Sequence, residues 1–222
     1  MRRFEAMLFD LDDTLLDRDH AVDNMFLMIL EKCYPGVKHS AIMLQKFKEY
    51  DKRSYGSNDK TKVLESFFDE FPPKYRLPRN DIQDYWNSNF PNCFSIDQNT
   101  ANIVNAIRMH MKIGIITNGA SQRQKAKILK TNLTNCFDII IISEEAGISK
   151  PDKRIFELAI NRLNVLPEAM LFVGDNLVLD IGGSQNANIK GIWFNPHMKK
   201  NDTEIKPYAE IDSLDRLLNY IT

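Results

Sequence analysis

The chain has 222 residues, which fits one large domain or a core domain with a smaller insertion. Hydrophobic residues make up 43% of the chain, enough to bury a core. The 29 Lys and Arg nearly balance the 30 Asp and Glu, so the formal net charge is -1. This balance excludes a whole-protein basic field of the kind that binds a nucleic acid polymer or an anionic membrane. We expect neither partner.

The three cysteines predict a reducing environment. Cys33, Cys93 and Cys136 are odd in number and far apart, and no C-x-x-C is present, which argues against a disulfide framework or a zinc site. The apolar run near the N-terminus is only a few residues long and ends in acids, so it is too short for a signal peptide. No apolar run approaches the length of a membrane span. We expect a cytoplasmic protein, either a monomer or a homodimer.

Five short apolar runs have the length of β-strands. They are apolar on both faces, as is typical of central parallel strands covered by helices. They are 6–9, 113–116, 139–142, 170–173 and 191–194. Helix-length segments at 121–131, 152–163 and 178–187 lie between the last four. This alternation predicts an α/β fold with a Rossmann-like, doubly wound parallel sheet, whose ligand site lies beyond the carboxyl ends of the strands.

About a hundred residues separate the first strand from the second. Residues 18–94 contain four stretches with apolar residues at helical spacing, and Pro72-Pro73 ends the third. We expect these residues to form a small helical bundle inserted into the fold. Residues 1–17 and 95–222 then form the α/β core.

Polar residues follow each of the first four strands, where the carboxyl ends of the strands converge on one crevice. Asp10 and Asp12 lie on the same side of an extended chain because side chains alternate. The residues expected in the crevice, in chain order, are Asp10, Asp12, Thr117, Asn118, Lys150, Asp175 and Asp180.

Four carboxylates in one crevice repel each other. Two unit charges at ~4 Å repel by about 1 kcal/mol in water and about 4 kcal/mol at an effective dielectric of 20. Some carboxylates therefore hold protons, or a cation lies among them. Oxygen ligands without His or Cys favour Mg²⁺. Thr117, the backbone N–H groups after it and Lys150 suit a bound phosphate. Together these groups indicate phosphoryl transfer.

Each motif alone has a plain structural interpretation. Acids at strand ends are often turn or N-cap residues, Thr-Asn-Gly is often a turn, and Lys-Pro often begins a helix. The first motif also faintly resembles a calcium loop, but Leu15 occupies the position that needs glycine. The order of the motifs and their placement at strand ends favour the functional interpretation.

With these motifs in place, the chain resembles the haloacid dehalogenase-like hydrolases over essentially its full length. The resemblance rests on D-x-D-x-T from Asp10 to Thr14, the strand-end Thr117, the Lys150-Pro151 pair, and G-D-x-x-x-x-D from Gly174 to Asp180. The predicted helical insertion resembles the cap of that family. The resemblance implies a cap that closes over the site and contacts the leaving group.

The resemblance implies a role for each carboxylate. Asp10 attacks phosphorus and forms an aspartyl-phosphate, and Asp12 protonates the leaving oxygen and later takes a proton from water. Mg²⁺ is held by the Asp10 carboxylate, the Asp12 backbone carbonyl and Asp175. Asp180 binds the metal through water or orients the metal shell and Lys150.

Thr117, Asn118 and Lys150 are implied to hold the phosphate oxygens. Segments 117–121, 143–147 and 193–199 resemble the branch that contains pyrimidine 5′-nucleotidases and acylneuraminate-9-phosphatases. The expected substrate is therefore a small phosphate ester, with a nucleoside 5′-monophosphate among the candidates.

Other activities stay open to different degrees. A sugar phosphomutase of the same superfamily, or a phosphatase of a sugar phosphate or phosphoglycolate, is an alternative. The dehalogenating branch lacks the aspartate that stands here as Asp12, which disfavours dehalogenation. A binding protein on an inactive scaffold is disfavoured because no motif position has lost its chemical group.

Substrate contacts in the helical insertion are harder to assign. Residues 52–58 form a polar connection that either faces the site or is solvated. Arg18 lies at the predicted hinge, where it either meets substrate or is a surface residue. Phosphonate hydrolysis would need a Schiff-base lysine from the insertion, and the eight lysines there give no way to nominate one.

Overall fold

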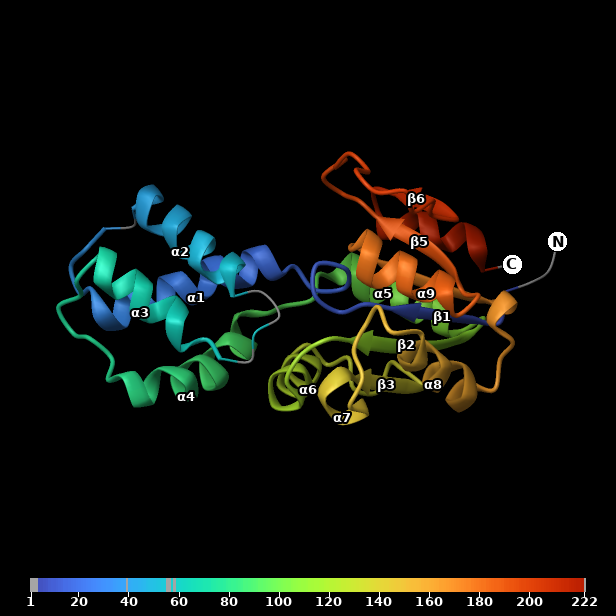
Figure 1. The fold of residues 1–222 in the computed structure, drawn as a ribbon, viewed down its shortest axis with the longest axis horizontal. Coiled ribbons are helices and arrows are strands. Elements are labelled where there is room, and N and C mark those ends of the chain that lie inside the picture. The colour runs from blue at the N-terminus through green and yellow to red at the C-terminus, as the bar shows by residue number, and fades with distance from the viewer. Residues whose placement is uncertain (1–3, 39, 55–56, 58, 222) are drawn as a thin grey trace.

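The computed structural model describes residues 4–38, 40–54, 57 and 59–221. Its centre is a six-stranded parallel sheet in the order β3-β2-β1-β4-β5-β6 (Figure 1). The strands are β1 (Ala6–Phe9), β2 (Lys112–Thr117), β3 (Ile139–Ile142), β4 (Met170–Gly174), β5 (Lys190–Phe194) and β6 (Ala209–Ile211). The predicted α/β fold is confirmed. Within the described ranges, no helix combines the length and the apolarity that a membrane crossing needs.

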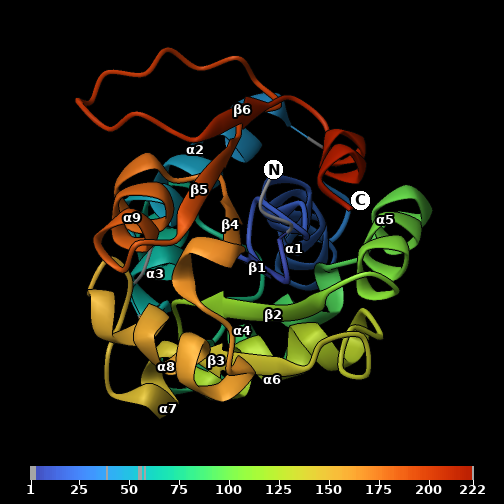
Figure 2. The same cartoon turned by 90° about the vertical axis from the view of Figure 1, so that its right-hand side faces the viewer.

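Helices cover both faces of the sheet. Side chains alternate along β1, so Met7 and Phe9 join one hydrophobic cluster and Ala6 and Leu8 join another. The first cluster includes residues of α5 (Gln98–Arg108), α6 (Ser121–Lys130) and η4 (Leu214–Tyr220); the second includes residues of α8 (Lys153–Leu163). Figure 2 shows α8 and α9 (Gly183–Asn186) on the opposite side of the sheet from α5. The sheet is therefore doubly wound.

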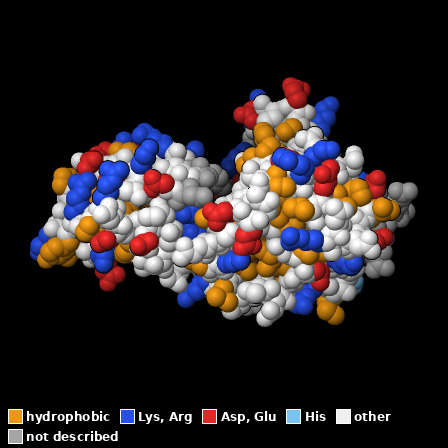
Figure 3. All heavy atoms as spheres, turned by 60° about the horizontal axis from the view of Figure 1, so that its bottom comes forward, with side chains coloured by type: hydrophobic (Ala, Val, Ile, Leu, Met, Phe, Trp, Pro, Cys, Tyr) orange, Lys and Arg blue, Asp and Glu red, His pale blue; other side chains and the backbone are white. Residues whose placement is uncertain are grey.

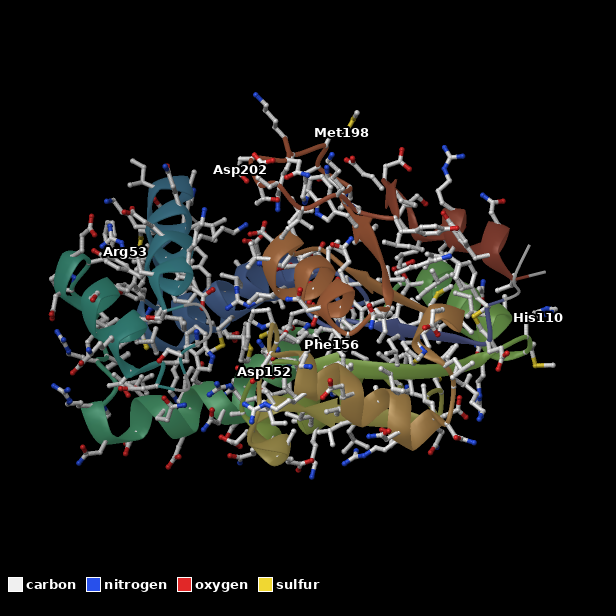
Figure 4. All side chains as sticks on the ribbon, turned by 45° about the vertical axis from the view of Figure 1, so that its right-hand side comes forward. Arg53, His110, Asp152, Phe156, Met198 and Asp202 are labelled. Atoms are coloured by element: carbon white, nitrogen blue, oxygen red, sulfur yellow. The ribbon has the colours of Figure 1, made fainter. Side chains whose placement is uncertain are left out.

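All six strands run toward one end of the molecule. His110, which precedes β2, lies at the end away from the helices α1 to α4 (Figure 4). The carboxyl ends of the strands therefore point toward those helices. From β1 the sheet extends to β2 and β3 on one side and to β4, β5 and β6 on the other. Open α/β sheets bind ligands at such a point, where the direction of the strand order reverses.

The helical lobe comprises α1 (Arg18–Cys33), α2 (Ala41–Arg53), α3 (Thr61–Glu70), α4 (Arg79–Asn89) and the turn η1 (Phe90–Cys93). It lies beside the carboxyl ends of the strands (Figure 1). Its core is aromatic, and Phe67 lies within 6.0 Å of the ring centroids of Phe26, Phe47 and Tyr34. The predicted helical insertion is confirmed as part of the fold, while its limits at 18 and 94 stay a prediction.

Several segments are not among the elements predicted above, and the following four contribute to the core or follow a strand of the sheet. They are α5, β6, η4 and the short helix α7 (Ser143–Ala146). Charged side chains of both signs are interspersed on the face drawn in Figure 3, in keeping with the nearly neutral composition.

Candidate active site

Three carboxylates meet where the strand order reverses. Asp10 follows β1 and Asp175 follows β4, and these two strands are hydrogen-bonded neighbours. Asp180 lies on the π-helical turn η3 (Leu177–Gly182). One carboxylate oxygen from each of the three lies within 4.8 Å of the others. The structure therefore brings together three of the four acids predicted from the sequence.

Lys150 lies inside this acidic cluster. Its Nζ donates to Asp10 Oδ1 at 2.5 Å and to Asp180 Oδ1 at 2.7 Å. Burial by itself lowers the pKa of Lys150, but the charges of Asp10 and Asp180 raise it above the ordinary lysine value. Lys150 is therefore a permanent cation, and it fixes the orientation of the Asp10 side chain.

One lysine does not neutralise three acids. Burial, and then the charges of Asp180 and Asp175, raise the pKa of Asp10 well above its ordinary value, and Lys150 opposes them. Burial and the charge of Asp180 raise the pKa of Asp175 to about 7. The protein alone holds these carboxylates under mutual repulsion. An oxygen-only cluster of this charge has the donor chemistry of a Mg²⁺ site.

The turn after β4 is built around Asp180. Asn176 Oδ1 accepts from Val178 N and Leu179 N, while Asn176 N donates to Asp180 Oδ2 at 3.0 Å. A Cβ atom added to Gly174 would lie 2.5 Å from the Cβ of Asp180. Glycine at 174 is therefore required for Asp180 to approach the end of β4 this closely.

The backbone of Asp175 also accepts a hydrogen bond from a residue of β5. Trp193 Nε1 donates to the backbone oxygen of Asp175 at 2.9 Å. This contact gives the segment 193–199, singled out above by resemblance, a structural role next to the acidic cluster.

Asp12 stands apart from the acidic cluster, in contact with helix α6. Lys127 Nζ donates to both carboxylate oxygens, at 2.7 and 2.8 Å, and Gln124 Nε2 donates to Oδ2 at 3.1 Å. Burial tends to raise the pKa of Asp12, but the charges of Lys127 and Arg18 and these hydrogen bonds bring it below its ordinary value. Asp12 is therefore ionised in this arrangement.

Thr117 and Asn118 follow β2 beside these groups. Thr117 Oγ1 accepts from Gln124 Nε2 at 2.6 Å. Asn118 makes a reciprocal pair with the backbone of Lys150: its Nδ2 donates to the Lys150 oxygen, and its Oδ1 accepts from the Lys150 N–H, both at 2.9 Å. Asn118 thus holds the Lys150 loop in place. Phosphate binding by Thr117, Asn118 and Lys150 stays a prediction.

A cavity of about 260 Å³ lies between the strand ends and the helical lobe. All seven predicted site residues line it, and the lobe and α6 supply further polar and aromatic groups: Arg18, Ser57, Lys60, Trp86, Phe90, Arg123, Gln124 and Lys127. Of the predicted connection 52–58, Ser57 lines the cavity, while Tyr55, Gly56 and Asn58 lie outside the described residues.

Lys60 is a buried cation that the lobe contributes to this cavity. Its Nζ donates to the Ser54 oxygen at 2.6 Å and lies 3.7 Å from Asp51 Oδ1. Burial lowers the pKa of Lys60 to about 8, with Asp51 opposing the shift. Arg18, the first residue of α1, pairs with the same Asp51 at 2.7 Å and also lines the cavity, while the predicted hinge stays a prediction.

The sequence interpretation missed Gln124, Lys127 and Lys60. The signal for the first two lies in the helix predicted at 121–131, where Gln124, Lys127 and Thr131 recur at helical spacing on the buried face. Polar residues on the buried side of an amphipathic helix indicate a polar partner. Lys60 gives no such signal, because nothing in its neighbourhood distinguishes it from the seven other lysines of the insertion.

Comparisons with known proteins identify the family to which the chain belongs. The family model described as haloacid dehalogenase-like hydrolase matches residues 7–194. The chain is 31% identical over 235 residues to a glyceraldehyde 3-phosphate phosphatase from Pyrococcus furiosus, covering 100% of this chain and 94% of that protein. It is 40% identical over 116 residues to the pyrimidine 5′-nucleotidase YjjG from Escherichia coli, covering 52% of each.

Among solved structures, YfnB from Bacillus subtilis, described as bound to magnesium, shares the fold with a TM-score of 0.83 at 24% identity over 100% of both chains. These findings confirm the enzyme class and the family predicted from the motifs. The chain belongs to the haloacid dehalogenase-like hydrolases, an enzyme family in which its named relatives are phosphatases and nucleotidases.

Proposed function

We propose that the protein is a Mg²⁺-dependent phosphomonoester hydrolase that acts on a small phosphorylated metabolite through an aspartyl-phosphate on Asp10. The observation that carries this proposal is the cluster of Asp10, Asp175 and Asp180 around the Nζ of Lys150, with Asp12 across the same cavity. A nucleophile, a cationic anchor and a separate acid/base group thus face one small space.

The reaction proceeds in two displacements at phosphorus. Lys150 holds Oδ1 of Asp10, so the second carboxylate oxygen of Asp10 attacks the phosphorus. The bond from phosphorus to the ester oxygen breaks. Asp12 is ionised in the substrate-free site, takes up a proton as the negative charge of the phosphate enters the cavity, and gives that proton to the leaving oxygen. Asp12 then takes a proton from water, and the resulting hydroxide cleaves the aspartyl-phosphate to free Asp10 and inorganic phosphate.

Mg²⁺ fits the donors that this site offers. Asp10 and Asp175, with the backbone carbonyl of Asp12, would hold the ion, and Asp180 would orient the shell around it. When bound, Mg²⁺ supplies the positive charge that offsets the carboxylates and the incoming phosphate. The raised pKa values of Asp10 and Asp175 are the sign of this charge deficit.

The cavity limits the substrate to a small molecule. Its volume of about 260 Å³ is near the lower end of the roughly 300–1,000 Å³ typical of small-molecule sites. The names of the relatives supply the first compounds to test: a pyrimidine nucleoside 5′-monophosphate and glyceraldehyde 3-phosphate. Phosphoglycolate and hexose phosphates complete the panel.

The test is release of inorganic phosphate across this panel, with Mg²⁺ or with EDTA. Asp10→Asn removes the nucleophile and keeps the side-chain shape, so we expect turnover to disappear while the Tm stays close to that of the wild type or rises. Asp212→Asn, at an exposed ion pair that does not line the cavity, is the matched control and keeps full activity. Turnover at the wild-type rate in Asp10→Asn, or in EDTA, would refute the proposal.

A further inference from the structure

We infer that Lys127 is a positioning residue that fixes the orientation of the acid/base carboxylate of Asp12 and joins it to the segment through which the chain returns from the helical lobe. This inference rests on the function proposed above. The residue belongs to α6 and lines the cavity, and none of the four sequence motifs includes it.

Two hydrogen bonds from Lys127 restrict the orientation of the Asp12 carboxylate. Nζ contacts Oδ1 at 2.7 Å and Oδ2 at 2.8 Å, so the lysine straddles the carboxylate rather than meeting one oxygen. Gln124, one helical turn earlier, donates to Oδ2 and with the same Nε2 to Thr117 Oγ1. Rotation of the carboxylate about its Cβ–Cγ bond would break these contacts, so its orientation is set from α6.

Burial makes this contact strong. The side chains of Lys127 and Asp12 are 5% and 14% exposed, so water screens their attraction less than at a surface ion pair. An ammonium so deeply buried requires compensation, and beyond Asp12 it is provided by aromatic rings. Lys127 Nζ lies 4.5 Å from the ring centroid of Phe94 and 5.6 Å from that of Phe90.

These rings belong to the return path from the helical lobe to the core. Phe90 begins η1, directly after α4, and Phe94 follows it. The two rings contact each other at 5.0 Å, and Phe90 contacts Trp86 of α4 at 5.2 Å. Lys127 thus touches the acid/base carboxylate on one side and the lobe connection on the other. A shift of the lobe that moves these rings changes the support of Lys127 and, through it, of Asp12.

The experiment is a double-mutant cycle read with p-nitrophenyl phosphate and Mg²⁺. Lys127→Met keeps most of the apolar stem but removes the ammonium, and with it both hydrogen bonds to Asp12 and the contacts of Nζ with the two rings. We expect kcat to fall by about a hundredfold, the effect of displacing a catalytic group by about 1 Å, with KM within about threefold. In an Asp12→Asn background, the same substitution causes no more than about a twofold further loss, because its effect passes through Asp12.

Lys130→Met, the same change at an exposed lysine of the same helix, is the matched control and leaves kcat unchanged. A purely structural role for Lys127 would lower kcat by the same factor in both backgrounds, and that result overturns the inference, as does wild-type kcat in Lys127→Met. If Lys127→Met does not fold, Lys127→Gln enters the same cycle. Turnover that survives in Asp10→Asn contradicts the proposed function. If Asp10→Asn is inactive but the kcat losses of Lys127→Met and Asp12→Asn multiply in the double mutant, only the role of Lys127 is contradicted.

Discussion

Asp175→Asn should stabilise the protein in the absence of metal while it abolishes phosphatase activity. Asp175 is half-buried, and the charge of Asp180 opposes its ionisation. The asparagine has nearly the same shape and carries no charge. The substitution therefore removes the repulsion, and with it one of the proposed ligands of Mg²⁺.

The magnitude follows from the pKa of Asp175, which is about 7 in the folded protein against an ordinary value of 3.8. Between these two values the folded state holds a proton that the unfolded chain has lost, so the stability that Asp175 contributes is full below about pH 4 and is lost as the pH rises to about 7. At about 1.4 kcal/mol per pH unit the loss is about 4 kcal/mol. Solvent screening of this partly exposed group reduces it to about 2 kcal/mol.

The assay is thermal unfolding of both proteins in EDTA from pH 5 to pH 8. The Tm of Asp175→Asn should exceed that of the wild type by about 4–8 °C at pH 8, and the difference should shrink toward pH 5. Addition of Mg²⁺ at pH 8 should raise the Tm of the wild type alone, because binding to the folded state stabilises it. A variant that is less stable than the wild type in EDTA at pH 8 would refute the electrostatic reasoning.

Three further predictions concern the parts that surround the cluster. Gly174→Ala places a Cβ 2.5 Å from the Asp180 side chain; it should cost about 1–3 kcal/mol in urea unfolding and abolish the rise of Tm with Mg²⁺. Phe67→Ala empties the centre of the aromatic core of the lobe and should cost about 3–5 kcal/mol, with a smaller loss for the half-buried Phe71→Ala. Lys60 lines the cavity and has a pKa of about 8, so it loses its positive charge above that pH. The wild-type KM for the anionic phosphate ester should therefore rise between pH 7 and 9. The KM of Lys60→Met should already be high at pH 7 and change less.

The core sheet and its acidic residues could be predicted because their signals are local. Each buried parallel strand is a short apolar run, and the predicted run 139–142 has the bounds of β3. A parallel sheet brings the carboxyl ends of its strands to one edge, so Asp10 and Asp175 are predicted to meet although they are 165 positions apart in the chain. The sheet topology alone therefore predicts that these distant residues lie close together.

The elements that escaped prediction lack such a signal or have a weak one. β6 has three residues, of which only Ile211 is buried, and a strand this short cannot show an alternating pattern. The helix α5 does carry a signal, because Asp97 caps it and Ile103, Val104 and Ile107 recur at helical spacing. It follows the helical insertion so closely in sequence that its return to the sheet is visible only in the structure.

The ion pair of Asp12 with Lys127 could not be predicted, because 115 residues separate its members and no topological rule brings a helix side chain to a strand end. The same reason explains why the sequence predicts the reaction better than the substrate. Asp10 and Asp175 are positioned by the sheet, whereas Lys60, Trp86 and other cavity-lining groups come from the helical lobe, whose packing depends on tertiary contacts. The relatives reported above are accordingly named for different substrates, a triose phosphate and a nucleotide. Substitutions on the lobe side of the cavity should change which ester is hydrolysed before they change how phosphorus is attacked.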